Sequence, residues 1–514
     1  MTQRFVKGTA MNTKVHPDHA PAPGDPMSNG DRDVRIVIIG AGVAGIATAY
    51  TFQQAGFTNF TILEKGSDVG GVWHWNRYPG LTCDVPSQIY QFSFAPKPDW
   101  THVFASGEEI QRYHRDVVDH FGLDAHLRLN TEITALRYDA DSSRWTITTD
   151  DGGTMVADFV VCATGVLHHP FTPDIPGMDT FEGPIIHTAR WDPNMQTAGR
   201  RIAVIGAGST GVQLVSAVQP QADAIIHFAR SPQWILWAPM RTRQGRVLTA
   251  LLRGRQGLHG FLYRRVFLRA SDILADITTT PSWRRNLVQW FARVSLRAQI
   301  RDRQLRAALT PDYQPLCKRQ VVSGSYYQAI TAPNARLVTD PIDTFTPSGV
   351  RTSSGEDHDV DLVVLATGFH AHNYMRPMSI IGRDGITLDD AWEKGPRGYR
   401  MTAIPGFPNL FTVIGPNPST ASISQQYTAE LTARYIVHWL KRFQNREVNE
   451  VEVTEQATDE FNDAVADAIG PTVWNTGCNS WYIGGNGNID LWPFDRRTMT
   501  RMLTAPDENH YHIR

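Results

Sequence analysis

Residues 35–45 read RIVIIGAGVAG, and residues 201–211 read RIAVIGAGSTG. In both stretches an apolar run leads into a GxGxxG loop and then into a helical pattern, which is the context that a dinucleotide-binding loop requires. A second repeat pairs VVCATG at 160–165 with VVLATG at 363–368. The internal repeat predicts two nucleotide-binding units, each of the βαβ kind.

The three glycines of each loop have separate tasks. The first allows the tight turn, the second lets a pyrophosphate approach the backbone, and the third lets the helix pack on the strand with its N-terminus toward the anion. They are Gly40, Gly42 and Gly45 in the first loop, with Ala44, and Gly206, Gly208 and Gly211 in the second, with Ser209 and Thr210. The alternative is a tight turn of small residues that holds no ligand.

The strand that follows each loop indicates which nucleotide the unit holds. The first ends at Glu64 and the second at Arg230, each 24 residues after the first glycine of its loop. A carboxylate accepts a hydrogen bond from a ribose 2′-hydroxyl, whereas a guanidinium pairs with a 2′-phosphate. The first unit is therefore predicted to hold FAD or NAD and the second NADP, with Lys318 or Arg319 adding charge. The alternative for Arg230 is a solvated residue at a strand end.

Two dinucleotides in one chain suggest that a hydride passes from NADPH to a bound flavin. The composition agrees with an enzyme of this kind. The chain has 514 residues with 49 Lys and Arg against 51 Asp and Glu, a net charge of −2, which excludes a broad basic footprint for nucleic acid. No apolar run is long enough to span a membrane, and residues 1–31 lack the apolar region of a signal peptide, so we expect a cytoplasmic protein.

The four cysteines are far apart in the chain and form no CxxC motif. They are Cys83, Cys162, Cys317 and Cys478. This spacing argues against a disulfide framework, a metal site or a dithiol redox pair, and reduced thiols are the simplest interpretation.

The predicted fold class is α/β, with two Rossmann-like dinucleotide-binding domains and a helical insertion in the second. The internal repeats and the change in composition along the chain indicate where the domains begin and end. We expect a disordered tail at 1–31, the first part of an FAD domain at 32–170, an NADP domain at 171–371 with a helical insertion at about 241–310, and the second part of the FAD domain at 372–514. The last part includes a long helix from about Ser424 to Arg442.

Between the two repeats, FEGPIIHTARWD at 181–192 resembles the FxGxxxHxxxW(P/D) fingerprint of the type I Baeyer–Villiger monooxygenases, a family of class B flavoproteins that use FAD and NADPH. The fixed positions are Phe181, Gly183, His187, Trp191 and Asp192. We expect His187 and Trp191 to couple domain rotation to cofactor position, with a packed linker as the alternative.

Other segments resemble the same family over about residues 33–500. They are GGVWHWNRYPG at 70–80, CD at 83–84, TPDYQPLCKR at 310–319, PGFPNLF at 405–411 and CNSWY at 478–482. The chain departs from the family pattern at cofactor-contact positions, namely Ala44, Val72, Thr82 and Ser231.

The resemblance implies an activity. Reduced flavin reacts with O₂ to form a C4a-peroxyflavin, which attacks a ketone and yields an ester or lactone, water and NADP⁺. Arg319 matches the family's active-site arginine, and Asp84 is its partner. A guanidinium stays charged beside a developing anion. Lys318 would point the opposite way, toward the phosphate of NADP.

The resemblance also implies cofactor contacts. The FAD contacts beyond the first loop are Val72, Trp73, Asp84, Tyr90, Ile133 and Gln425, and the NADP contacts beyond the second loop are Ser231, Lys318, Arg319 and Trp481.

Three other functions are open at this point. A related monooxygenase would oxidise nitrogen or sulfur, a disulfide reductase would need a close cysteine pair, and a non-catalytic regulator would bind NADP(H) without a flavin. The partners expected are a small-molecule ketone and O₂. The particular ketone and the oligomeric state are left open, and the segments 241–310, 370–400 and 474–487 are candidates for shaping the substrate pocket.

Overall fold

Two parallel sheets, each carrying its own glycine loop, organise the computed structural model, which describes residues 32–254, 265–266, 268–419 and 423–514. The tail predicted at 1–31 lies outside the described residues. The first sheet has the order β19-β7-β1-β2-β3, formed by Leu410–Thr412, Phe159–Cys162, Ile36–Ile39, Phe60–Leu63 and Leu127–Arg128. The second has the order β13-β10-β9-β17-β8, formed by Ala335–Val338, Ala224–Phe228, Arg201–Ile205, Leu362–Leu365 and Ile185–His187.

The central strands of both sheets are buried on both faces. All residues of β1, β7 and β17 are buried and apolar, which is the pattern of a parallel sheet covered by helices on both sides. α1 (Val43–Gln54) follows the first loop and packs along α12 (Gln425–Gln444), whereas α4 (Ser209–Val218) follows the second loop. The two-domain α/β fold class expected from the sequence repeat is confirmed.

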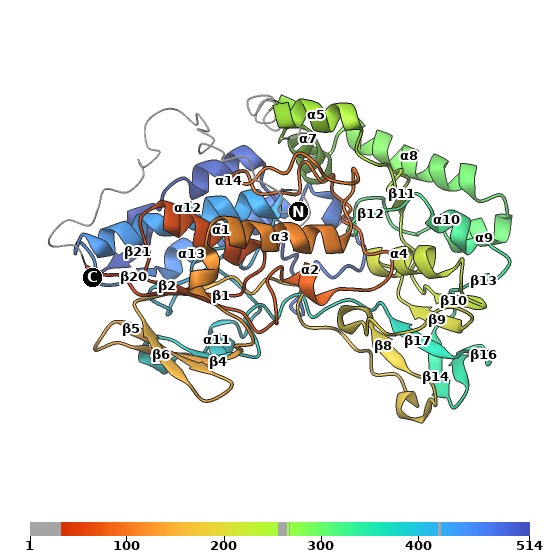
Figure 1. The fold of residues 1–514 in the computed structure, drawn as a ribbon, viewed down its shortest axis with the longest axis horizontal. Helices are drawn as coiled ribbons and strands as arrows, with labels where there is room; N and C mark the ends of the chain where they lie inside the picture. Colours follow the sequence, from red (N-terminus) through yellow and green to blue (C-terminus); the bar gives the residue numbers. More distant parts are fainter. Residues whose placement is uncertain (1–31, 255–264, 267, 420–422) are drawn as a thin grey trace.

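The C-terminal part of the chain returns to the first sheet. β19 pairs in parallel with β7, so that Leu410 lies opposite Val160 and Thr412 opposite Cys162. α12 covers α1, and α13 (Glu455–Ile469) and α14 (Arg496–Leu503) complete this side of the molecule, seen in blue in Figure 1. The first sheet is therefore assembled from both ends of the chain.

Each parallel sheet has a smaller antiparallel sheet beside it. In the first unit this sheet consists of β18 (Ser379–Ile381), β4 (Ile133–Asp139), β5 (Arg144–Thr149) and β6 (Thr154–Ala157), with β18 added in parallel to β4. In the second it consists of β14 (Ile342–Thr346), β15 (Gly349–Thr352) and β16 (Asp357–Asp359). Outside the helical insertion, the other described α-helices and strands are α2 (Val72–Trp75), α3 (Gly107–His120), α10 (Tyr326–Ile330), α11 (Leu388–Ala391), β11 (Ile235–Leu236), β12 (Val321–Val322), β20 (Val451–Val453) and β21 (Tyr511–Ile513).

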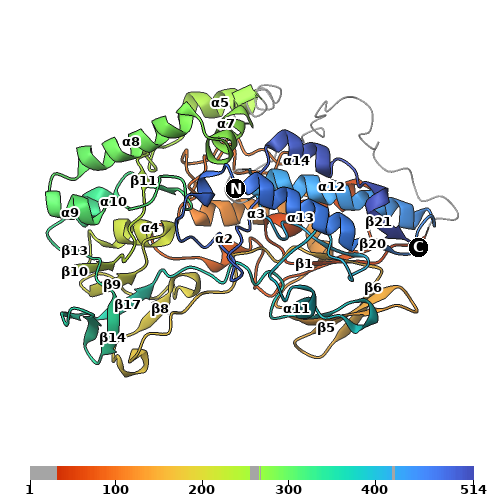
Figure 2. The same ribbon diagram turned by 180° about the vertical axis from the view of Figure 1, so that it is seen from behind.

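The predicted helical insertion forms one edge of the molecule in both Figure 1 and Figure 2. Its described helices are α5 (Arg246–Gly254), α7 (Leu268–Thr279), α8 (Trp283–Gln299) and α9 (Arg303–Ala308). Ion pairs attach it to the first unit, since Arg253 lies 2.7 Å from Asp99 and Arg496 lies 2.7 Å from Asp272. None of the described helices combines the length and the apolar character that a bilayer-spanning segment needs.

The interpretation of four unpaired cysteines is wrong. Cys317 and Cys478 form a disulfide, with Cα atoms 6.2 Å apart, across a separation of 161 residues. The sequence spacing hides the pair because only the return of the C-terminal segment brings the two together. Cys83 and Cys162 are free and buried. The disulfide lies close in sequence to two predicted site residues. Cys317 comes two residues before Arg319, and Cys478 comes three residues before Trp481.

One buried histidine makes the fold sensitive to acid. His114 in α3 is fully buried between aromatic rings, and neither ring nitrogen has a hydrogen-bond partner among the described residues. Burial lowers the pKa of His114 to about 3 from an ordinary 6.5. Because the unfolded chain binds this proton first, His114 removes stability as the pH falls from about 6.5 toward 3.

Replacing His114 with Phe should abolish this contribution, which is about 2 kcal/mol at pH 5. We expect the thermal midpoint of His114→Phe to fall less between pH 7.5 and pH 5 than that of the wild type. The same comparison on the exposed His512→Phe serves as the control. An unchanged acid slope in His114→Phe would contradict the assignment.

Candidate active site

A cavity of about 720 Å³ extends from the first glycine loop to the second. Its walls come from both loops, from α2, and from the two connecting segments 163–169 and 366–369. The carboxyl ends of β1 and β9 both lead into it, which is where ligands bind in open parallel sheets.

The first loop is shaped by two close approaches of backbone to backbone. Gly40 has φ +104°, and a Cβ on it would lie 2.6 Å from the carbonyl oxygen of Ala163. A Cβ on Gly45 would lie 1.8 Å from the carbonyl oxygen of Gly40. Gly42 caps α1 without a side chain, so the first amide groups of the helix are open to the cavity.

Glu64 is held at the end of β2 by two backbone amides. Its Oε2 accepts a hydrogen bond of 2.7 Å from the amide of Ala41, and its Oε1 accepts one of 2.7 Å from the amide of Gly66. Burial raises the pKa of this carboxyl, and the two amides act in the opposite direction. The carboxylate lines the cavity beside the loop, where the sequence predicts a ribose hydroxyl.

The second loop repeats this geometry. Gly206 has φ +120°, and a Cβ on it would lie 2.3 Å from the carbonyl oxygen of Ala366. A Cβ on Gly211 would lie 2.0 Å from the carbonyl oxygen of Gly206. A Cβ on Gly208, in contrast, meets no described atom within 4 Å, so this position faces open space along the cavity.

Two cations gather beyond the second loop. Lys318 Nζ donates a 3.0 Å hydrogen bond to Ser231 Oγ and lies 4.4 Å from the centre of the Tyr313 ring. Burial lowers the pKa of Lys318, the charge of Asp312 acts in the opposite direction, and the nearby charge of Arg230 lowers the pKa further. Neither cation forms an ion pair with a carboxylate in the described part of the chain. Lys318 lines the cavity, whereas Arg230 and Ser231 lie outside its lining.

Arg319 points away from Lys318 and pairs with Asp84. One guanidinium nitrogen lies 3.0 Å from Oδ1 and 3.2 Å from Oδ2 of Asp84. The charge of Asp84 raises the pKa of Arg319 above its ordinary value, so this guanidinium stays protonated. Burial raises the pKa of Tyr482 to about 12, against the effect of the adjacent Arg319. The cavity thus holds a permanent, oriented cation.

The other expected FAD contacts also border the cavity. Trp73 Nε1 donates a 3.0 Å hydrogen bond to the hydroxyl of Tyr90, and Val72 and Ile133 form apolar wall. The side-chain amide nitrogen of Gln425, at the start of α12, is buried and has no hydrogen-bond partner among the described residues. An unpaired donor at a cavity wall is costly unless a ligand acceptor meets it. These features fit a flavin dinucleotide.

The five fingerprint residues do not line the cavity. Phe181 packs in the core of the second unit, and a Cβ on Gly183 would lie 2.5 Å from its ring. His187 Nδ1 accepts a 3.1 Å hydrogen bond from the amide of Ala189, and burial lowers its pKa. Trp191 is buried in the second core and Asp192 accepts from the amide of Asn194 in an exposed turn. The role of His187 and Trp191 in coupling domain rotation to cofactor position stays a prediction.

Sequence reasoning missed one of the residues that join the two units. Gln213 in α4 accepts a 2.9 Å hydrogen bond from the hydroxyl of Tyr78 and donates one of 2.9 Å to the carbonyl of Thr82. Between them, Gly80 lies so close to α4 that a Cβ would be 2.7 Å from the Cβ of Ala217. The Pro-Gly pair in RYPG indicates a turn, but it does not show that the turn contacts α4.

Two of the three segments predicted to shape the substrate pocket contribute to the cavity lining. Residues 375–378 and 479–481, which include Trp481, line the cavity. No described residue of 241–310 does, so the expectation that the insertion shapes this pocket is wrong for those residues. Cys317 and Cys478 are also absent from the lining, which argues against a disulfide reductase.

Comparisons with known proteins place these features in context. Residues 37–235 match the family model described as pyridine nucleotide-disulphide oxidoreductase. An uncharacterized monooxygenase of Mycobacterium tuberculosis is 42% identical over 93% of this chain and 96% of the relative. A Baeyer–Villiger monooxygenase of Streptomyces coelicolor is 36% identical over 93% of this chain and 92% of the relative. The crystal structure of OTEMO in complex with FAD and NADP has a TM-score of 0.84 at 26% identity, covering 94% of this chain and 100% of that one.

Two alanine substitutions in the second loop should separate packing from binding. Gly211→Ala places a Cβ 2.0 Å from a carbonyl oxygen and should cost about 3 kcal/mol of unfolding free energy. Gly208→Ala has room and should leave stability unchanged, while its methyl group weakens NADP⁺ binding about tenfold, or about 1.4 kcal/mol.

Thermal denaturation measures the first effect, and NADP⁺ titration by calorimetry measures the second. Each variant is the control for the other. Equal loss of stability in both variants would contradict the close packing of Gly211. Full NADP⁺ affinity in Gly208→Ala would contradict the approach of NADP⁺ to Gly208.

Proposed function

This chain belongs to the Baeyer–Villiger monooxygenase family, and from that premise we propose that Asp84 and Arg319 form its catalytic charge pair and that a small ketone binds beside them. The observation that carries the proposal is the ion pair itself. It lies on the wall of a cavity to which both glycine loops contribute, so both cofactors and the substrate would have access to it.

The chain is an NADPH- and O₂-dependent flavin monooxygenase that converts a ketone to an ester or lactone. Its cofactors are FAD and NADP. When bound and reduced by NADPH, the flavin supplies the activated oxygen that is inserted beside the carbonyl.

Arg319 provides positive charge where negative charge develops on the substrate. A guanidinium oriented in advance stabilises a developing oxyanion without reorganising at the moment of reaction. Asp84 holds this group by two contacts and keeps it charged, because its own charge raises the pKa of Arg319. Tyr482 lies against the same guanidinium and limits its movement.

Glu64 and the amides at the start of α1 would hold the adenosine ribose and pyrophosphate of FAD. Gln425 would donate its unpaired amide hydrogens to the flavin ring. On the other side, the amides at the start of α4 would hold the pyrophosphate of NADP, with Trp481 near its nicotinamide end.

The 2′-phosphate of NADP would bind to Arg230, Ser231 and Lys318. The two side-chain cations repel each other and have no ion-pair partner among the described residues. A phosphate dianion would relieve this repulsion and form charge-assisted hydrogen bonds with both groups. The arrangement thus favours NADPH over NADH.

The same contacts support the domain boundaries predicted from the sequence. We place the FAD domain at 32–170 and 372–514 and the NADP domain at 171–371, because β19 joins the first sheet and β17 the second. A cytoplasmic location stays a prediction.

Removing the cation should abolish oxygen insertion and spare flavin reduction. We expect Arg319→Ala to lower the rate of ester formation by about 10²–10³, the loss typical of a missing electrostatic stabiliser, or more. Anaerobic reduction of the flavin by NADPH, followed by stopped-flow absorbance, should remain within a few-fold of the wild-type rate.

Asp84→Asn keeps the shape of the partner while removing its charge, and it should lower ester yield less than Arg319→Ala does. Gas chromatography of the products from a panel of cyclic, linear and aromatic ketones measures the yield. Full ester formation by Arg319→Ala would overturn the assignment of Arg319 as the stabilising cation. If only amines or sulfides stimulate NADPH oxidation, the assignment of a ketone as substrate is wrong.

Removing one cation of the phosphate site should change the cofactor preference. We expect Arg230→Ala to raise the KM for NADPH about tenfold, equivalent to about 1.4 kcal/mol, and to leave the KM for NADH nearly unchanged. Arg137→Ala, an exposed arginine on β4, is the matched control. A parallel rise in both KM values would contradict a role for Arg230 in phosphate recognition.

A further inference from the structure

Large apolar side chains are exposed on the helical insertion and almost nowhere else on the described surface. Eleven of the fifteen that are markedly exposed lie between Val247 and Val294. We call this set, with the arginines around it, the insertion face. Its apolar members are Val247, Leu248, Leu251, Val266, Ile273, Leu274, Trp283, Leu287, Trp290, Phe291 and Val294. Exposed apolar side chains concentrated in one part of the surface indicate an interaction site.

α8 carries the clearest part of this face. Trp283, Leu287, Trp290 and Val294 follow one another at intervals of four, three and four residues, so they form one stripe along the helix. They are 69%, 52%, 58% and 37% exposed. The residues on the opposite side, among them Ala292 and Leu296, are buried. α8 therefore has two apolar sides, and only one of them packs against the protein.

Arginines surround the stripe. Arg284 lies on one side of it, and Arg293 and Arg297 lie on the other, as the helical periodicity requires. The described residues between 241 and 306 include thirteen arginines and three aspartates, with no lysine or glutamate.

The three aspartates are already engaged in the structure. Asp272 pairs with Arg496, Asp276 lies 3.5 Å from Arg284, and Asp302 caps α9. The insertion face is therefore strongly positive. Because the whole chain has a net charge of −2, the rest of the chain is net negative.

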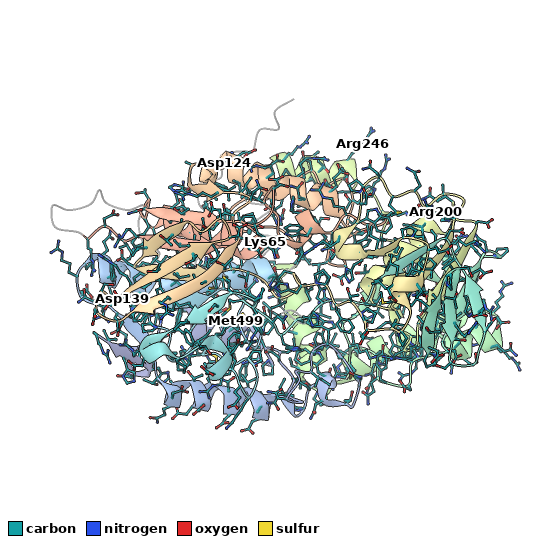
Figure 3. All side chains as sticks on the ribbon, turned by 90° about the horizontal axis from the view of Figure 1, so that it is seen from below. Lys65, Asp124, Asp139, Arg200, Arg246 and Met499 are labelled. Atoms are coloured by element: carbon teal, nitrogen blue, oxygen red, sulfur yellow. A yellow bond between two sulfur atoms is a disulfide. The ribbon has the colours of Figure 1, made fainter. Side chains whose placement is uncertain are left out.

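The helices that carry the face form one continuous edge. Figures 1 and 2 show α5, α7 and α8 along the same margin of the molecule, seen from opposite sides. Figure 3 shows Arg246, at the start of α5, projecting outward from the periphery. The ion pairs Arg253–Asp99 and Arg496–Asp272 hold this edge to the body of the protein. Since no described residue of the insertion lines the cavity, the face is separate from the catalytic site.

We propose that the insertion face docks onto the surface of an anionic lipid bilayer, with the apolar side chains inserted at the headgroup level and the arginines bound to lipid phosphates. Tryptophan and aliphatic residues flanked by arginine are the composition of helices that lie in a membrane interface. Guanidinium groups bind phosphate in a bidentate manner, and anionic lipid attracts clustered cations. The negative remainder of the protein is repelled by the same surface, which orients the molecule with this edge toward the lipid.

Two other occupants fit the face less well. A second copy of this chain docked by a two-fold axis would place arginines opposite arginines. A nucleic acid would meet the arginines, but the leucine, isoleucine and valine side chains would have no apolar partner on its backbone. An anionic lipid bilayer offers both an anion for the arginines and an apolar environment for the stripe.

Vesicle flotation with the purified, full-length holoenzyme tests the proposal. We expect the enzyme to float with vesicles of phosphatidylcholine containing 30% phosphatidylglycerol at low salt and to bind pure phosphatidylcholine at least tenfold more weakly. Leu287→Ser/Trp290→Ser should weaken binding at least fivefold, and Arg293→Glu/Arg297→Glu should do the same and reduce the dependence on salt.

The controls are matched by residue type and exposure. Val156→Ser removes an exposed aliphatic side chain from β6, and Arg137→Glu reverses a charge on β4, both away from the insertion face. Both should bind vesicles as the wild type does. All variants should retain wild-type NADPH oxidation with ketone, because none of these residues lies in the cavity lining.

Three results would overturn the proposal. The first is a holoenzyme that does not float with anionic vesicles at low salt. The second is wild-type vesicle binding by both double variants. The third is a dimer seen by analytical ultracentrifugation, or a complex with duplex DNA, that Leu287→Ser/Trp290→Ser abolishes while its vesicle binding is unchanged. The insertion face would then bind that partner and not lipid.

Discussion

Each glycine loop lies so close to the backbone of a neighbouring strand end that no side chain fits between them. The carbonyl of Ala163 faces Gly40 in the first unit, and the carbonyl of Ala366 faces Gly206 in the second. This constraint explains why the two loop repeats are accompanied by the repeats VVCATG and VVLATG. The contact fixes each loop on its sheet, opens the first amides of the following helix to the cavity, and so creates both dinucleotide sites.

The cavity depends on how these two rigid units meet. Gln213, on the helix of the second loop, binds the segment 78–82 that belongs to the first unit, and that segment leads directly to Asp84. Arg319 reaches Asp84 from the other unit, and the disulfide between Cys317 and Cys478 ties the segment just before Arg319 to the C-terminal part of the chain. The active-site ion pair is therefore also a contact between domains, so a change in domain orientation alters its geometry.

The features predicted from the sequence are those that local pattern determines. The loops, the strand ends at Glu64 and Arg230 and the alternation of Lys318 and Arg319 all depend on residues close in sequence. The disulfide was missed because its cysteines are 161 residues apart, and no local signal marks a contact that depends on the return of the C-terminal segment. The Gln213 contact was missed for the same reason, since a glutamine within an apolar helix has no distinctive pattern.

Arginine has three different roles in this molecule, and the nearest counter-charge decides which. Arg319 has a permanent carboxylate partner, which fixes its position and keeps it charged beside the reacting groups. Arg230 has another cation as its neighbour, so the structure favours a phosphate there. Arg293 lies over the Trp234 ring beside an exposed apolar stripe and forms no ion pair with a described residue, so the proposal gives it an external anion. The roles we propose for these arginines in catalysis, cofactor choice and surface attachment therefore differ because their surroundings differ.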